Sequence, residues 1–395
     1  MPATSAAETS PNPDIVVTAN TAQTDEVSII TQGCEVSGWE EIAITLRAEG
    51  FPPSFDIAMS AQHPIAPSDA QNNDPSINEI LGYQGDAQRQ TLQVKIGTQI
   101  VITGYIDTSG EDGTAETHRL RVMGRGKTQD LIDASAEIPT GYLNNASTYE
   151  VCATLCETYG IDVVLSTDSK LVDEAVPQAS LNYGETAADL IQRYSRYSSV
   201  LAYEDSSGNL VLADAGADTA SSGVAFGVNI QEYSIQNDVS QLVSEICVTQ
   251  SSVDNFQDLG DGGFILLTVP SPVPVRHRRL YMPQEQSAEG IAFTERKAKW
   301  EMARRIGRSV SVRVTVDSWR DSAGNLWKPN TMIPITHPAL RIADKELCLS
   351  EVTFKRSNAT GTTAEMLLLP KAAFAPEPVN LTPANVSDIS APDAK

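Results

Sequence analysis

The most regular alternation of hydrophobic and polar residues lies between positions 309 and 317. Valines occupy positions 310, 312, 314 and 316. Because successive side chains of a β-strand point to opposite faces, all four valines share one face. The pattern predicts a strand in a half-buried sheet. Directly after it, Trp319 and Trp327 flank the turn-forming run 321–325, which is typical of a hairpin.

A second hairpin is predicted to close this region. Leu347 and Leu349 share one strand face, whereas Val352 and Phe354 have the opposite parity. A β-bulge adds one residue to a strand and restores the parity of the side chains that follow it. We therefore predict a bulge near Ser350.

Strand signals also dominate the first part of the chain, from 27 to 137. Several short alternating segments are separated by turns, a pattern that favours a small barrel or a sandwich. Closing the sheet would remove its exposed edges, so we expect a barrel. The alternating segments are 42–46, 55–59, 92–96, 100–104 and 118–122.

In residues 138–225 the sequence predicts helices as well as strands. A capping box at 147–150 opens one predicted helix, and a second is expected over about 185–198. A strand at 161–165 and a hairpin over 201–212 complete a small α/β module.

Strands return after this module, together with one helix expected at 295–306. Thr294 is its predicted N-cap, and the ion pairs of Glu295 with Lys299 and of Glu301 with Arg305 have the favourable spacing. Each pair contributes only about 0.2–0.5 kcal/mol, so burial of an apolar face must hold the helix.

The predicted fold class is α+β, mainly β, with two small β-barrel domains, an intervening α/β module and a C-terminal helix with β-hairpins. A chain of 395 residues is longer than one core usually fills. The expected organisation is a flexible arm at 1–26, an N-terminal barrel domain at 27–137, the α/β module at 138–225, a C-terminal barrel domain at 226–374 and a flexible tail at 375–395.

Charge is divided unevenly along the chain. The net charge is −28 over residues 1–270 and +6 over 271–370, within a total of −23. One interpretation is an acidic surface that aids solubility. The other is that the basic block docks on an acidic patch of a neighbouring copy, and that acidic surface lines a passage for nucleic acid. Specific nucleic-acid binding is disfavoured, because duplex affinity depends on lysine and arginine contacts to phosphates.

Five cysteines, an odd number, do not indicate a disulfide framework and fit a reducing cytosol. The sequence begins without a basic and apolar signal segment, and no apolar run reaches the roughly 18 residues of a membrane helix. A soluble product without a membrane anchor is expected. Cys152 and Cys156 are four apart on a predicted helix, but no second pair or nearby histidine completes a metal site, so small buried side chains are the better interpretation.

The run 124–128, Gly-Arg-Gly-Lys-Thr, suggests a phosphate-binding loop. That motif needs a glycine five residues before the Gly-Lys pair, and Arg121 stands there. We interpret the run as a turn in which Arg125 and Lys127 reach solvent or a partner. Neither clustered histidines nor a nucleophile elbow is present. The sequence predicts no catalytic residue, no metal and no cofactor.

The order of elements in the C-terminal region resembles a known family. An Arg-Arg-Leu run at 278–280 precedes the basic helix and the alternating strand, and residues 319–330 read W-R-D-S-A-G-N-L-W-K-P-N. This order is similar to that of the baseplate hub proteins of Mu-like contractile-tailed bacteriophages, the family of tail protein P and late control protein D. A looser resemblance at 100–107 and 120–133 extends it over roughly residues 27–375.

The resemblance implies a structural protein and not an enzyme. The implied hub is a homotrimer with two barrels per subunit, whose ring adapts the sixfold tail tube to the threefold central spike and leaves a lumen through which DNA passes. The implied partners are the spike protein, the tail tube or its initiator, and other baseplate proteins. The implied location is the virion tail baseplate, after synthesis in the host bacterial cytoplasm.

Two alternatives remain at this point. A tail-associated peptidoglycan hydrolase or sugar-binding module would need a deep acidic cleft, and the equivalent hub of a tailocin or secretion machine would share the architecture. The predicted subunit or partner contacts are Arg304, Arg305, Trp319, Trp327, Arg125 and Lys127. For the tryptophans, packing inside the hairpin is the competing interpretation.

Overall fold

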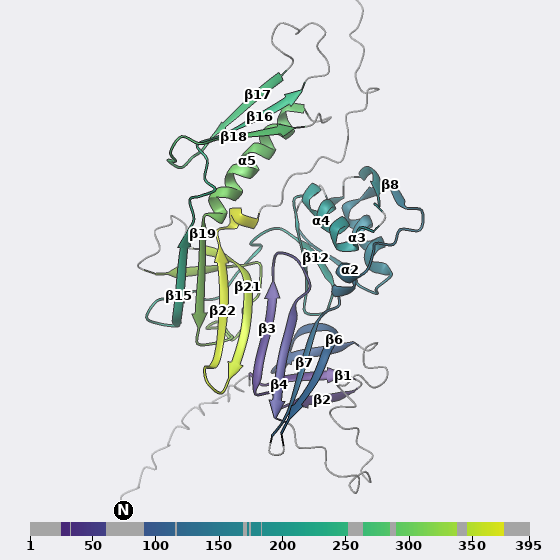
Figure 1. Cartoon of the computed structure of the whole chain (residues 1–395), viewed down its shortest axis with the longest axis vertical. Coiled ribbons are helices and arrows are strands. Elements are labelled where there is room, and N and C mark those ends of the chain that lie inside the picture. The colour runs from purple at the N-terminus through teal and green to yellow at the C-terminus, as the bar shows by residue number, and fades with distance from the viewer. Residues whose placement is uncertain are drawn as a thin grey trace, which may run out of the picture.

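The computed structural model describes residues 25–374 except 32, 61–90, 115–116, 169–171, 174, 183, 252–263, 285–289 and 338–345. It is a mainly β structure with helices gathered in two places (Figure 1). Apart from residues 25 and 26, the predicted terminal arms lie outside the described residues, as does the Gly-rich loop at 254–263.

The described strands of the N-terminal region lie side by side in one sheet, but not in sequence order. Its outer strands are short, whereas the β6–β7 hairpin is long and extends beyond its neighbours (Figure 1). The strands are β1 (Val27–Thr31), β2 (Cys34–Ser37), β3 (Glu41–Arg47), β4 (Ser54–Ser60), β5 (Leu92–Ile96), β6 (Gln99–Gly113) and β7 (His118–Gly126).

The α/β module follows as a separate packed body with its own hydrophobic core. The predicted capping box of Ser147 and Glu150 is confirmed, and Thr186 with Asp189 forms another at the second helix. The predicted hairpin is also confirmed, as β11 pairs with β12. The elements are α2 (Gln129–Asp133), β8 (Tyr142–Ser147), α3 (Thr148–Glu157), β9 (Val163–Ser166), β10 (Ala175–Ser180), α4 (Ala187–Tyr197), β11 (Leu201–Glu204) and β12 (Leu210–Ala213).

The C-terminal region contains a second set of strands that joins the large sheet. The alternating valines form β19, and Val312, Val314 and Val316 are buried as predicted. The strands are β13 (Asp218–Thr219), β14 (Val224–Ala225), β15 (Ile230–Asn237), β19 (Val310–Val316), β20 (Thr331–Thr336), β21 (Glu346–Ser357) and β22 (Gly361–Leu369), followed by the 3-10 helix η4 (Lys371–Phe374).

One pairing joins the N-terminal and C-terminal regions into a single sheet. β3 pairs antiparallel with β21, so the strand order runs β15-β19-β22-β21-β3-β4-β7-β6-β5-β1-β2 (Figure 1). One continuous core lies behind both regions: Ile44 on β3 and Phe354 on β21 are opposite each other and both fully buried. The two β-rich regions are therefore coupled through hydrogen bonds as well as side-chain packing.

A bulge in β21 makes this shared core possible. The ladder between β21 and β22 changes register between Leu349 and Glu351, at the predicted position. Leu347, Leu349, Val352 and Phe354 are consequently all buried. Without the extra residue, half of this strand would turn its hydrophobic side chains to the opposite face.

The remaining helix builds a small unit of its own. Helix α5 (Gly290–Arg308) packs on a three-stranded sheet of β16 (Glu245–Ser251), β17 (Phe264–Pro270) and β18 (Arg279–Gln284). Ala298 and Met302, on the apolar face of the helix that was expected to be buried, pack against this sheet. The predicted N-cap at Thr294 is wrong, because the helix begins four residues earlier and Thr294 is buried within it.

Candidate assembly surfaces

The described part of the chain offers little for catalysis. Within it, His, Cys, Asp and Glu side chains do not gather in groups of three or more that could hold a metal ion. Cys152 and Cys156 are fully buried in the core of the α/β module, and burial raises the pKa of both thiols, that of Cys156 to about 12. None of the described helices has the length and apolar character needed to cross a membrane.

The Gly-Arg-Gly-Lys-Thr run comprises the last three residues of β7 and the two residues before α2, so the predicted turn is confined to Lys127 and Thr128. The run binds a carboxyl group of the protein itself. Glu204, on β11, accepts hydrogen bonds from the backbone N–H groups of Lys127 (3.0 Å) and Thr128 (3.1 Å) and from the Thr128 hydroxyl. A side chain at Gly126 would collide with this carboxylate, so only glycine fits there. This contact of Glu204 with Lys127 and Thr128 joins the α/β module to the end of the N-terminal sheet, and we call it the clasp.

The environment of Glu204 shifts its ionisation. Its side chain is buried, and loss of solvent raises the pKa of the carboxyl to about 7, although the donors of Thr128 and Lys127 favour the charged form. The neighbouring Asp205 raises it further. The sequence contains no local signal for this contact, because Glu204 and Thr128 are 76 positions apart.

The two basic residues of this run, Arg125 at the end of β7 and Lys127 after it, have different surroundings. The Arg125 guanidinium forms ion pairs with Asp107 and Asp133, both at 2.6 Å, which raises the pKa of Arg125. The side chain of Lys127 lies against Gly208, in the turn between β11 and β12. Arg125 is therefore engaged within the subunit, and its contact role with a partner stays a prediction, as does that of Lys127.

Helix α5 carries the predicted arginine pair on its polar side. Arg305 forms an ion pair with Glu301 at 2.6 Å, at the predicted spacing, and donates to the backbone oxygen of Gln241 at 2.9 Å. The Arg304 guanidinium lies over the Trp300 ring, 5.2 Å from its centroid. Arg304 also borders two hollows beside α5, and Arg308 lines both of them with it.

The predicted contact tryptophans lie in the core side of their hairpin. Trp319 is fully buried, and its indole N–H donates to the backbone oxygen of Thr363 at 2.8 Å. The indole N–H of Trp327 donates to the backbone oxygen of Ser318 at 3.0 Å. The Arg356 guanidinium covers the Trp319 ring at 4.7 Å. The packing interpretation is confirmed, and neither indole is available on the surface of a free subunit.

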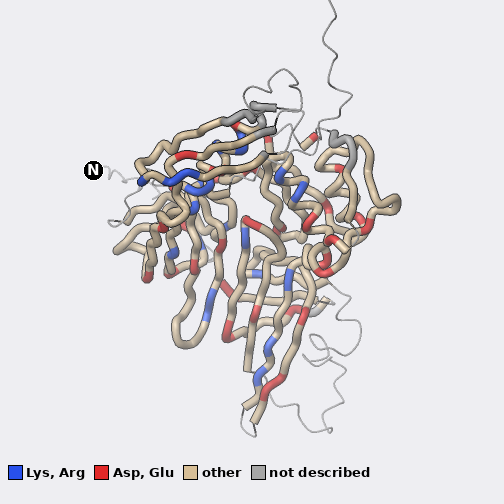
Figure 2. Tube along the Cα trace, turned by 45° about the horizontal axis from the view of Figure 1, so that its top comes forward, with Lys and Arg blue, Asp and Glu red and all other residues tan. Residues whose placement is uncertain are grey.

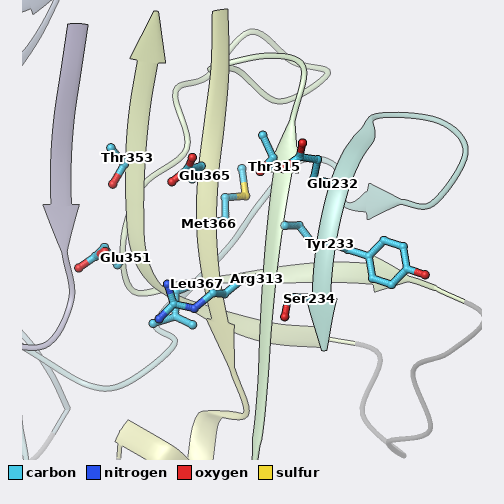
Figure 3. Close-up of a pocket in the computed structure, with 11 residues that line it drawn as sticks. Glu232, Tyr233, Ser234, Arg313, Thr315, Glu351, Thr353, Glu365, Met366 and Leu367 are labelled. Atoms are coloured by element: carbon cyan, nitrogen blue, oxygen red, sulfur yellow. The ribbon is translucent and has the colours of Figure 1, made fainter. Parts of the chain in front are cut away.

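The outer face of the C-terminal sheet forms a shallow groove across β15, β19, β22 and β21 (Figure 3). Glu351 pairs with Arg47 at 2.9 Å, and Glu365 pairs with Lys355 at 2.6 Å. Arg313 projects between these strands (Figure 3). Most of the side chains that line the groove are charged or carry a hydroxyl group. The groove therefore does not resemble an apolar small-molecule site.

An aromatic cluster that sequence reasoning missed lies at the end of this sheet. Tyr233 on β15 contacts His337 with ring centroids 4.1 Å apart and Phe226 at 5.6 Å. Figure 3 shows Tyr233 pointing past the outer edge of β15, away from the polar residues of the groove. Phe226 and Tyr233 are each about half exposed.

The charges are distributed differently among the parts of the molecule. Acidic residues prevail on the α/β module, whereas basic residues gather along α5 and on several strands of the large sheet (Figure 2). On β7, Arg119 pairs with Glu41 and Arg121 with Asp56, which forms a ladder of exposed ion pairs across the N-terminal strands. On β3 and β4, these two acidic side chains are therefore paired with arginines of β7.

Three parts of the chain match sequence families of phage baseplates. Residues 26–126 match "Mu phage baseplate assembly protein GpP-like, N-terminal", residues 128–214 match "Baseplate hub protein gp44-like, second domain", and residues 291–377 match "Mu phage baseplate assembly protein GpP, fourth domain". The matches fall on the N-terminal sheet, the α/β module and the region from α5 to η4.

Whole-chain comparisons agree with these matches. The 43 kDa tail protein of prophage MuSo2 from Shewanella oneidensis is 29% identical, with a TM-score of 0.73 over 89% of this chain and 99% of that one. A tail protein from Neisseria meningitidis, 19% identical, shares the fold with a TM-score of 0.71 over 89% of this chain and 98% of that chain. The architecture is that of phage tail proteins.

The baseplate hub protein gp44 of Escherichia phage Mu is 26% identical over 353 residues, which cover 88% of each chain. The chain belongs to the baseplate hub family of Mu-like contractile-tailed phages. It is a structural hub protein, and the resemblance inferred from residues 278–330 is confirmed.

Proposed function

We propose that three copies of this chain form a closed ring that adapts the sixfold tail tube to the threefold central spike. The observation that carries the proposal is the pairing of β3 with β21, which sets two β-rich regions side by side in one subunit. Three such subunits place six similar units around one axis. The described strands form one open sheet and not the two closed barrels predicted from the sequence, so barrel closure is part of this proposal and requires a neighbouring subunit to cover the edge at β15.

A ring with this symmetry needs two different contact surfaces on each subunit, because head-to-tail contacts close only if one face complements another. The basic side of α5, with Arg304 and Arg305, is one candidate surface. The acidic α/β module of the next copy is its candidate counterpart (Figure 2). Contacts between opposite charges steer assembly and weaken as salt increases.

The ring has other partners and a passage. The spike protein binds one end, and the tube or its initiator binds the other, with further baseplate proteins at the outside. DNA passes through the lumen without specific binding, which an overall charge of −23 supports because phosphates are repelled. The chain works in the tail baseplate of the virion, without cofactor or catalysis, after synthesis in the host cytoplasm.

The test is the mass of the purified protein measured by light scattering at several salt concentrations. A mass three times the 42.4 kDa of one subunit supports the ring, and a mass of one subunit at all concentrations contradicts it. The double variant Arg304→Glu and Arg305→Glu should dissociate while the subunit stays folded. A matched control is Arg119→Glu and Arg121→Glu, on the exposed ladder of β7, which should retain the mass of the wild type.

A further inference from the structure

Strand β15 ends the large sheet and leaves one edge without a partner strand among the described residues. In an antiparallel ladder, every second backbone N–H and C=O of such a strand points away from its neighbour. Native proteins usually protect an edge with a short strand, lysine or proline. β15 has eight residues, and Glu232 is its only charged side chain.

Large apolar side chains follow this open edge. The exposed fractions are 50% for Phe226, 80% for Val228, 48% for Tyr233 and 64% for Val239. Grouping of exposed apolar residues beside an open edge marks an interaction surface more strongly than either feature alone.

The apolar side chains continue the core and do not form a separate patch. The ladder places Tyr233 opposite Val314, which is buried on the core side of β19. Tyr233 therefore lies on the core side of the sheet, at the rim where the next strand would begin. A strand added there would cover Tyr233 and Phe226 and satisfy the free backbone groups of β15.

The beginning of the chain supplies a segment with suitable chemistry. Ile15, Val16, Val17 and Thr18 are consecutive β-branched residues, which have the highest preference for strands. The chain enters the described fold at Asp25, beside the C-terminal sheet: its carboxylate accepts from Arg320 at 2.7 Å and its backbone oxygen from Arg356 at 2.7 Å.

The length of this segment permits contact with another subunit. At about 3.3 Å per residue, the ten residues from Asp25 back to Ile15 span up to about 33 Å when extended. A donated segment and an open edge are two different surfaces of one chain, so their pairing is head-to-tail and is compatible with a closed ring.

We propose that β15 of each subunit accepts the 15–18 run of a neighbouring copy as an added strand. The proposal rests on the ring proposed above and names one of its contacts. Backbone hydrogen bonds supply much of the affinity. Phe226 and Tyr233 contact every second side chain of the incoming strand, and these apolar contacts supply the specificity.

The test uses two variants of the full chain. The donor variant is Val16→Pro with Val17→Asp, and the acceptor variant is Phe226→Ser with Tyr233→Lys. The control is the Arg119→Glu and Arg121→Glu variant of β7, which lies on neither of the proposed contact surfaces. Light scattering gives the mass, and circular dichroism with the melting temperature verifies folding.

We expect both variants to need at least tenfold more protein than the wild type to reach the trimer mass, with the control unchanged. Wild-type mass in both variants overturns this contact but leaves the ring intact, whereas a monomeric wild type contradicts the ring itself. Dissociation of the acceptor variant alone overturns the assignment of the donor. Dissociation of the donor variant alone overturns the assignment of β15. A lower melting temperature at unchanged mass would place the segment within its own subunit and overturn the exchange between copies.

Discussion

The two ends of the large sheet differ in how they expose their last strand. At the N-terminal end, β2 has four residues and lies between Gly33 and Gly38, both with positive φ. At the C-terminal end, β15 is twice as long and bordered by exposed aromatic side chains. A short edge between turns offers few backbone groups to another chain, whereas a long apolar edge offers many. The difference indicates that one end of the sheet closes the subunit and the other is kept for assembly.

The largest effect is expected at the pairing of β3 with β21, where the N-terminal and C-terminal regions share one core. Phe354→Ala removes a fully buried ring from the junction of β21 with β3 and should cost about 3–5 kcal/mol of unfolding free energy. Because the core is continuous, hydrogen exchange should accelerate in β3 and β4 as well as in β21 and β22. Faster exchange in the C-terminal strands alone would show that the two regions are independent.

The next effect concerns the clasp between the N-terminal sheet and the α/β module. Glu204→Ala leaves the N–H groups of Lys127 and Thr128 without their acceptor, at a cost of about 1–3 kcal/mol for each buried donor left unsatisfied. Chemical denaturation should detect the loss. Glu150→Ala, which removes half of the capping box of α3, is a milder control at about 1 kcal/mol.

The pH dependence of this clasp has a defined sign. Burial raises the pKa of Glu204 from 4.5 to about 7, so the folded state binds a proton between these values that the unfolded state does not. Its contribution to stability is therefore largest below pH 4.5 and falls as pH rises to 7. The charged groups around it include Asp205, and Tyr105 lies close enough for Glu204 to raise the pKa of its phenol. In Glu204→Gln the melting temperature should lose this slope; an equal slope in both proteins would assign it to other groups.

A comparison of amide exchange sharpens the contrast between the two edges. Assembly should slow exchange at the outward N–H groups of β15 by tenfold or more, because they gain acceptors, and should leave β2 unchanged. The measurement compares the wild type at concentrations above and below the assembly midpoint. Equal protection of both edges would mean that the sheet closes through β2 as well.

The smallest effect is expected on the exposed ladder of the N-terminal strands. Arg121→Ala removes an ion pair with Asp56 in which both side chains are more than a third exposed, so the loss should stay below about 1 kcal/mol and shrink in high salt. Thermal melts at two salt concentrations are sufficient. A loss near that of Phe354→Ala would show that the ladder, and not the core, holds the N-terminal strands.

Local elements were predictable where neighbouring residues decide the structure. The alternation of valines specified β19, the spacing of Ser147 and Glu150 specified a helix start, and the parity change near Ser350 specified a bulge. The family was likewise visible in the order of elements from residue 278 onward. The start of α5 was not predictable, because Thr294 has the side chain of an N-cap residue but lies buried within the helix.

The sequence by itself determined the alternating strands, the capped start of α3 and the hairpin of β11 with β12, because these depend on residues within a few positions of one another. Only the tertiary structure decided which strands meet. The pairing of β3 with β21 joins Arg47 to Glu351 across 304 positions, and Glu204 reaches the loop at Thr128 across 76. The entropic cost of closing a long loop grows only slowly with its length, so distance along the chain barely restricts which segments pair. Which segments meet is decided instead by how well their surfaces fit.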